Sequence, residues 1–334
     1  MTSRERVNAC LDNSLEGRIP RQLWTLPWSK THYPEMVLRI EKEYPDDIMG
    51  CPSLYKSPPM LQGDHYSLGE FTDEWGCTFV NIQEGIIGEV KESVIADWSD
   101  VKDLRVPKEL LTVDRDAVND FCRTTDRFIL QGSCARPFER LQFLRRSEAL
   151  YVDLAEDSEG LHRLIQKVHG FFLDEMKAWA TTDVDALFYM DDWGSQQSLL
   201  ISPSMWRKIF KPLYKDYVDL AHNAGKRIFM HSDGCIRDII PDLVELGVDA
   251  LNSQIFCIGV ENLKPYRDRI CFWGEVDRQH LLPYASTEEI RLAVGEVYAN
   301  LYHNGGVMAQ CEFGPGANPE NVYTVFKTWD ELTG

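Results

Sequence analysis

The sequence predicts an α/β fold, a closed (β/α)8 TIM barrel with N-terminal additions, formed as a single domain over residues 1–334. Two observations predict it. Apolar runs typical of buried strands alternate with longer helical stretches, and this alternation implies parallel strands. About eight such strands can be counted, the number that closes a barrel. A doubly wound open sheet is the alternative, but no GxGxxG motif follows the first strand, which disfavours a dinucleotide-binding fold.

The expected strands follow one another along the whole chain. Arg21–Leu26 is the first, and one further strand falls within 45–90. The segments Asp73–Phe79 and Ile86–Val90 are expected to form a short antiparallel excursion from the barrel. The six remaining strands begin near residues 127, 186, 227, 250, 270 and 307.

Helices are expected between the strands, where apolar residues recur at helical spacing. Ser286 with Glu289 three residues later forms a capping-box pattern at the start of one of them. The expected helices are Ser3–Leu15, Pro34–Glu43, 108–126, one starting in the segment after Cys134, 150–180 with a break at Ser158–Gly160, Pro203–Ala224, Ile236–Leu246, Val260–Arg267, Thr287–Asn300 and one after Pro319.

Composition narrows the classes of function. The net charge of −18 argues against nucleic acid or an anionic membrane as a partner. No run of 18 apolar residues predicts a membrane span, and the polar N-terminus does not resemble a secretory signal. The nine cysteines are scattered without a CxxC motif, which favours free thiols in a reducing compartment. We therefore expect a cytoplasmic protein, and a homodimer is compatible with the sequence.

Polar residues follow the predicted strands where those strands end. In Arg227–Gly234 (RIFMHSDG), an apolar run stops at His231 and Asp233 and then turns at a glycine. The same ending recurs in Ala186–Gly194, Ile270–Asp277 and Val307–Gly314. Because barrel enzymes carry their active residues at the carboxyl ends of the strands, we expect one site there. The residues at these ends include Gln131, Arg136, Asp191, Asp192, Trp193, Gln196, His231, Asp233, Cys235, Asn252, Gln254, Glu275, Asp277, Gln279, Cys311 and Glu312.

The strand ends are rich in histidine, cysteine and carboxylate side chains, which are ligands of zinc. The favoured ligands are His231, Glu275 and Cys311, with Asp233 as an alternate or a fourth. No local zinc motif supports this set. By spacing alone Cys311 reads as a small buried residue, and His231 reads equally well as a histidine satisfied within the core or a loop.

Asp191 and Asp192 are the candidate catalytic carboxylates. Neighbouring side chains on an extended segment face opposite ways, so at most one of the two points into the barrel mouth. A carboxyl group close to another has a raised pKa and can serve as a general acid. Helix capping or a salt bridge is the alternative role for either residue.

Substrate contacts are expected from an arginine, two glutamines and several aromatic residues. Arg136 could clamp an anionic group, although a surface ion pair explains it equally well. Packing in the core is the commoner role of such aromatic residues. The candidates are Trp24, Trp28, Arg136, Trp193, Gln196, Gln254 and Phe313.

Three segments, Phe229–Gln254, Phe272–Pro283 and Met308–Val322, together resemble the uroporphyrinogen decarboxylase superfamily. Within it they look like the methyltransferase members that serve corrinoid systems. The resemblance covers most of the chain and is strongest from residue 186 to the end. It implies a (β/α)8 barrel with its site at the carboxyl ends of the strands, which agrees with the strand count above.

The chain departs from this family at two points. Uroporphyrinogen decarboxylases carry an arginine-rich N-terminal segment that binds substrate carboxylates, whereas no arginine lies between Arg21 and Arg39 here. The related methyltransferases place zinc on a His-x-Cys pair and a later cysteine. Here the later cysteine matches Cys311, but the pair is His231-x-Asp233. The third ligand would come from Asp233, Glu275 or Cys235, or else no metal binds.

The resemblance implies a zinc-dependent methyltransferase that moves a methyl group from a small methylated compound, such as a methoxylated aromatic, to a separate corrinoid protein. No Asp-x-His-x-x-Gly cobalamin motif is present, so the corrinoid must come on a partner. Zinc would polarise the ether oxygen, and Asp191 or Asp192 would protonate it. The alternatives are a cofactor-free decarboxylase, a methylcorrinoid-to-thiol methyltransferase, and a non-catalytic binding module.

Overall fold

Eight parallel strands form a nearly closed barrel in the computed structural model, which describes residues 1–334. Their order around the barrel is β1-β11-β10-β9-β8-β7-β6-β2, so neighbours in space are mostly neighbours in sequence. Between β1 and β2 the backbone N–H of Asp47 donates to the carbonyl of Arg21 at 2.8 Å. The strands are β1 (Arg21–Thr25), β2 (Ile48–Gly50), β6 (Phe128–Leu130), β7 (Ala186–Met190), β8 (Arg227–Ser232), β9 (Ala250–Ser253), β10 (Cys271–Trp273) and β11 (Val307–Phe313). The predicted barrel is confirmed, with its strands close to the expected positions.

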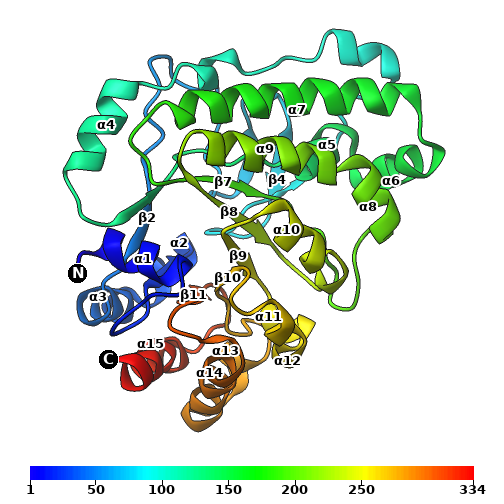
Figure 1. Cartoon of the computed structure of the whole chain (residues 1–334). Helices are drawn as coiled ribbons and strands as arrows, with labels where there is room; N and C mark the ends of the chain where they lie inside the picture. Colours follow the sequence, from blue (N-terminus) through cyan, green and yellow to red (C-terminus); the bar gives the residue numbers. More distant parts are fainter.

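Helices surround the barrel, and the two chain termini lie on the same side of the molecule (Figure 1). The predicted helix Pro34–Glu43 and the capping box of Ser286 with Glu289 are confirmed. The α-helices are α1 (Ser3–Leu11), α2 (Pro27–His32), α3 (Pro34–Glu43), α4 (Arg115–Arg123), α5 (Pro137–Arg145), α6 (Ser147–Glu156), α7 (Glu159–Ala180), α8 (Pro203–Ile209), α9 (Lys211–Asn223), α10 (Ile240–Leu246), α11 (Ile255–Ile258), α12 (Val260–Leu263), α13 (Leu281–Tyr284), α14 (Thr287–Leu301) and α15 (Pro319–Thr333). Short 3-10 turns cover Trp98–Lys102, Lys108–Leu111, Arg237–Ile239 and Lys264–Tyr266.

Some predicted helices are shorter or divided, for identifiable reasons. The helix expected over Pro203–Ala224 is divided at Phe210, because Pro212 has no N–H to donate to the preceding turn. The helix expected over 108–126 is a 3-10 turn followed by α4, which begins where the Asp114 side chain accepts from the N–H of Ala117. The first helix ends at Leu11, two residues before Asn13 takes a positive φ of 50°.

An antiparallel excursion leaves the barrel between β2 and β6, as predicted. Its strands are β3 (Gly69–Thr72), β4 (Thr78–Asn81) and β5 (Glu89–Val90). The expected strand at Asp73–Phe79 starts late, because Asp73 Oδ1 accepts from the N–H groups of Trp75 and Cys77 and forms a turn. Trp75 packs edge-on against Phe171 of α7, with ring centroids 4.9 Å apart. The excursion is thereby fixed beside α7.

Aromatic residues fill the barrel interior below the strand ends. Phe229 of β8 contacts Phe128 of β6 and Trp273 of β10, with ring centroids 5.4 Å and 5.2 Å apart. Trp273 in turn meets Trp24 of β1 at 5.3 Å. This packed layer separates the bottom of the barrel from the polar residues above it. None of the helices is long and apolar enough to cross a membrane.

Candidate active site at the carboxyl ends of the strands

A cavity of about 630 Å³ opens at the carboxyl ends of the barrel strands. Its inner wall comes from the ends of the strands, including Met190, Asp192, His231 and Glu312. Its outer wall comes from the antiparallel excursion with α5 and α7. The aromatic residues of the lining are Trp24, Tyr55, His65, Phe71, Trp75, Phe79, Phe143, Phe171 and Phe172. The size and the aromatic lining suit a small organic molecule.

Side-chain alternation decides which strand-end residues reach this cavity. Asp192 lines it, whereas Asp191 is fully buried beneath it. The carboxylate of Asp191 accepts from the N–H of Glu139, in the first turn of α5, at 2.8 Å and from the hydroxyl of Tyr214 at 2.6 Å. Asp191 therefore caps α5. Helix capping was the expected alternative to acid catalysis for the Asp191–Asp192 pair.

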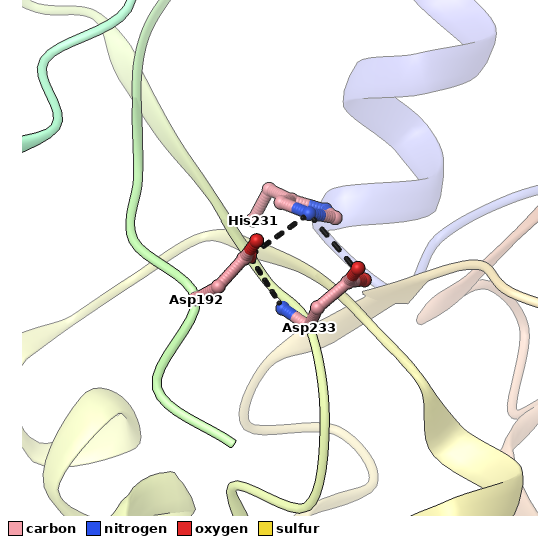
Figure 2. Close-up of side chains that lie close together, drawn as sticks. All are labelled: Asp192, His231 and Asp233. Carbon is pink, nitrogen blue, oxygen red and sulfur yellow. Dashed lines mark hydrogen bonds and ion pairs between the residues drawn. The ribbon is translucent and has the colours of Figure 1, made fainter. Parts of the chain in front are cut away.

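Asp192, His231 and Asp233 form a close group on the cavity wall (Figure 2). His231 Nε2 lies 3.5 Å from Asp192 Oδ1 and 3.6 Å from Asp233 Oδ1. The backbone N–H of Asp233 donates to Asp192 Oδ1 at 2.9 Å, which links the loop after β7 to the end of β8. One potential ligand atom from each residue lies within 4.8 Å of the others. This spacing allows one cation to contact all three.

Asn252, at the end of β9, fixes the orientation of the His231 ring. His231 Nδ1 lies 2.6 Å from Asn252 Oδ1, and the amide nitrogen of Asn252 donates to the carbonyl of Trp273. Since that second bond identifies the Asn252 oxygen as the acceptor, Nδ1 must carry a proton. Nε2 then faces the two aspartates and is the nitrogen available to a metal or a proton.

The three residues of this group control one another's ionisation. Burial alone would lower the pKa of His231, but the hydrogen bond that His231 donates to Asp192 and the charges of Asp233, Asp192 and Glu275 raise it to about 10. Burial alone would raise the pKa of Asp192, yet its hydrogen bond to His231 and the charge of that ring lower it. Without a cation, the site therefore holds an imidazolium beside an aspartate anion.

Arg278 lies beside this group and joins three carboxylates. Its guanidinium contacts Asp233 Oδ2, Glu312 Oε2 at 3.0 Å and Glu275 Oε2 at 3.6 Å. Burial raises the pKa of Glu275 to about 7, against the opposing charge of Arg278. Burial likewise raises the pKa of Glu312, and Arg278 again opposes the shift.

Cys311 is not brought into the Asp192–His231–Asp233 group. It is fully buried in β11, and alternation places it on the face of the strand opposite to Glu312, which lines the cavity. Burial raises the pKa of the Cys311 thiol well above its usual range, so a thiolate is disfavoured there. Glu275 is closer to the group, through Arg278, but it does not line the large cavity.

The seven predicted substrate-binding residues fall into three places. Trp24 and Arg136 line the large cavity, and the Trp24 ring lies 5.4 Å from that of His231. Gln196 and Gln254 line a second cavity of about 250 Å³ on the other side of Arg278. The remaining three residues line neither of these two cavities.

Trp193, Trp28 and Phe313 are these remaining residues, and each packs against other aromatic rings. Trp193 is fully buried, stacks on Phe138 at 4.0 Å and donates its ring N–H to Tyr214. Trp28 stacks on His32, and Phe313 stacks on Tyr33. All three rings contact other rings in the structure, and their role in substrate binding stays a prediction.

Six charged residues of the cavity lining were not anticipated from the sequence: Asp73, Glu74, Glu139, Arg140, Glu175 and Arg278. Arg278 follows Glu275 by three positions in the loop after β10, and Glu175 lies within the long helix α7. The position of Arg278 beyond a strand end could have suggested it. No sequence pattern indicates that Glu175 is buried, because a glutamate within an amphipathic helix normally faces solvent.

The donor set fits a divalent ion with an open coordination position. Asp233 Oδ1 is buried and has no hydrogen-bond partner, although it lies beside His231 Nε2. Asp233 can use this oxygen for a metal while its Oδ2 remains with Arg278. One imidazole nitrogen and two carboxylate oxygens are ligands that zinc accepts, and three protein ligands are typical of a catalytic site. The thiolate-containing set implied by the resemblance is not assembled.

A polar cluster in a cavity at the carboxyl ends of the barrel strands is the usual active-site arrangement of (β/α)8 enzymes. The chain belongs to the uroporphyrinogen decarboxylase (URO-D) family, whose model matches residues 72–332. This confirms the family resemblance inferred from the sequence.

One solved structure supports the fold, and two others are more distant. A methyltransferase from Methanosarcina mazei superposes with a TM-score of 0.71 at 15% identity, covering 100% of both chains. A β-(1,4)-mannanase from Podospora anserina gives 0.45 at 10% identity, over 100% of this chain and 66% of that one. The 3-keto-D-glucoside 4-epimerase YcjR from E. coli gives 0.41 at 13% identity, over 67% and 86%. The last two likenesses carry no functional information. A search of the curated proteins found no match.

Proposed function

We propose that this chain is a zinc-dependent methyltransferase that moves a methyl group from a small methylated compound to a corrinoid carried by a partner protein. One observation supports it above all: Asp192, His231 and Asp233 converge on the wall of an aromatic cavity, with His231 Nε2 facing both carboxylates. The likeness to a methyltransferase adds support, although at 15% identity it speaks only for the fold.

A zinc ion held by these three residues would act as a Lewis acid on the ether oxygen of the methyl donor. Neighbouring residues of the chain keep the three ligand atoms free to bind the zinc ion. Asn252 keeps the proton of His231 on Nδ1, and Asp192 stays ionised because its pKa is lowered. Arg278 holds Asp233 by Oδ2 and leaves Oδ1 free.

The transfer forms a bond from carbon to the reduced cobalt of the partner and breaks the bond from carbon to oxygen. The oxygen leaves with the electron pair and takes up a proton. Glu275, whose pKa burial raises to about 7, is a candidate source of this proton, and it reaches the Asp192–His231–Asp233 group through Arg278. Asp192 suits a metal ligand better than a proton donor, since its pKa is lowered by His231.

The cavity walls agree with an aromatic methyl donor. The ring of Trp24 lies beside His231, and Tyr55, Phe71 and Phe143 line the same space. A cavity of about 630 Å³ holds a single-ring compound with room for a neighbouring group. A methoxylated aromatic is therefore the favoured substrate class.

Decarboxylation without a cofactor is the second candidate, because the family is named for that reaction and three arginines line the cavity. All three arginines, Arg136, Arg140 and Arg278, already contact carboxylates of the protein. Because these arginines are already paired, none is free to bind a substrate carboxylate. The pairing therefore disfavours a substrate with many carboxylates.

The test combines metal content with activity. Protein loaded with zinc and then dialysed should retain about one zinc per chain, and His231→Ala and Asp233→Ala should lose it. His222→Ala is the matched control, since His222 pairs with Asp249 on the surface, outside the cavity. Methyl transfer from 2-methoxyphenol to reduced cobalamin, followed by absorbance, should stop with a chelator and return with zinc. Absence of zinc uptake, together with full transfer in His231→Ala, would refute the proposal.

A further inference from the structure

Glu175 is the one carboxylate of the large cavity without a basic partner. Seven acidic residues line that cavity. Asp73 and Glu74 contact Arg140, Glu139 contacts Arg136, Asp192 contacts His231, and Asp233 and Glu312 contact Arg278. No ion pair reaches Glu175, although only 2% of its surface is exposed.

The surroundings of Glu175 are otherwise largely apolar. Phe171 and Phe172, one turn earlier on α7, line the cavity beside it, and Trp179 is one turn later on the same helix. Ser133, also on the cavity wall, is near enough to assist the carboxyl by hydrogen bonding. A buried carboxyl group that serves packing alone would be costly, because its oxygens require hydrogen-bond donors.

Burial raises the pKa of Glu175 to about 8, and the charge of Glu74 adds to the shift, against the effects of Ser133, Arg136 and Arg140. Near neutral pH the group is mostly a neutral acid that a cationic ligand would ionise. It can accept a hydrogen bond in either state.

Glu175 and the His231 group belong to separate parts of one cavity. Glu175 is influenced by Glu74, Arg136 and Arg140 on the outer wall. Glu139 lies between the two parts, since its pKa, raised by burial, is shifted by Arg136 as well as by Asp192 and His231. A ligand whose methyl group lies at His231 can extend its other end toward α7 within the same cavity.

We infer that Glu175 binds a hydrogen-bond donor, a hydroxyl or an ammonium group, on the part of the substrate that does not react. This rests on the proposed function for the position of the methyl group, and it narrows the substrate class to methylated aromatics that carry such a donor. Glu175 is then a residue that sets specificity and takes no part in the transfer itself.

The test measures binding alone, by quenching of tryptophan fluorescence and by calorimetry, with 2-methoxyphenol, 3-methoxybenzylamine and methoxybenzene as probes. Wild-type protein should bind the two donor-bearing probes about tenfold or more tightly than methoxybenzene, which has no donor. Glu175→Met should remove that preference. Glu175→Gln keeps a hydrogen-bond acceptor but cannot carry a negative charge. It should preserve the affinity for 2-methoxyphenol, and it should lower the affinity for 3-methoxybenzylamine if the natural group is an ammonium.

Asp174→Asn is the matched control, because Asp174 is the neighbouring residue on the exposed face of α7. It should leave all three affinities unchanged. The inference is overturned if wild-type protein prefers no donor-bearing probe, or if Glu175→Met weakens all probes equally. The binding assay needs neither metal nor partner. If the protein prefers donor-bearing probes through Glu175 but transfers no methyl group, the proposed function is refuted and the role of Glu175 stands.

Discussion

Replacing Asn252 tests how the proposed zinc site is prepared without touching any of its three proposed ligands. Asn252→Ala removes the acceptor that keeps the proton on His231 Nδ1. The ring could then carry its proton on Nε2, the nitrogen that faces Asp192 and Asp233. Residues in this supporting position typically contribute a factor of about 10 to 100 in metal affinity, or roughly 1.4–2.7 kcal/mol.

The assay is a zinc competition titration against a chromophoric chelator, with thermal unfolding of the metal-free protein measured in parallel. Asn252→Asp should restore most of the affinity, because a carboxylate accepts from Nδ1 even more strongly than an amide. Asn262→Ala is the control, since the Asn262 side chain donates only to the backbone carbonyl of Ile258, four residues earlier in the neighbouring short helix α11. Equal zinc affinity in wild type and Asn252→Ala would refute the role given to Asn252.

Two further predictions concern stability. Burial raises the pKa of Asp46 to about 7, above the ordinary value of about 3.9 in an unfolded chain. Between these two pH values the folded protein binds one more proton than the unfolded chain. The free energy of unfolding therefore falls as pH rises from 4 to 7. Asp46→Asn should therefore be more stable than wild type at pH 8, by roughly 2–4 kcal/mol in urea unfolding, and this gain should vanish near pH 4. A gain that does not depend on pH would contradict the raised pKa of Asp46. Gly234 has a φ of +77°, and a Cβ there would lie 2.1 Å from the carbonyl oxygen of Gly194, so Gly234→Ala should cost about 2 kcal/mol or more. Gly170→Ala, within α7 where a Cβ would meet nothing within 4 Å, is the control for that measurement and should be neutral or stabilising.

The sequence could predict the barrel because its signals are local. Each strand is a short apolar run that ends in a polar residue, and each helix has its own periodicity and caps, as Ser286 with Glu289 illustrates. The order of strands then follows from the rule that parallel strands joined by helices lie side by side. At Asp73 the predicted boundary was wrong by several residues, because the Asp73 side chain accepts from the N–H groups of Trp75 and Cys77 and forms a turn where a strand was expected.

The candidate site was only partly accessible from the sequence. His231 and Asp233 were found because His231 lies at the end of β8 and Asp233 follows that strand directly. The alternation rule correctly limited the adjacent aspartates to one in the cavity. The same rule, applied to β11, would have separated Cys311 from Glu312, but the family resemblance drew attention to the cysteine. Glu175 could not be found, because its burial depends on the excursion that packs against α7.

The antiparallel excursion has a consequence for how substrate choice can change. The reactive group lies on strand ends that the barrel holds rigidly, whereas Phe71, Trp75 and Phe79 of the opposite wall come from a segment inserted between β2 and β6. Insertions of this kind tolerate changes in length and sequence better than barrel strands do. New substrates could therefore be accommodated by remodelling one peripheral segment, with the residues at the strand ends left intact.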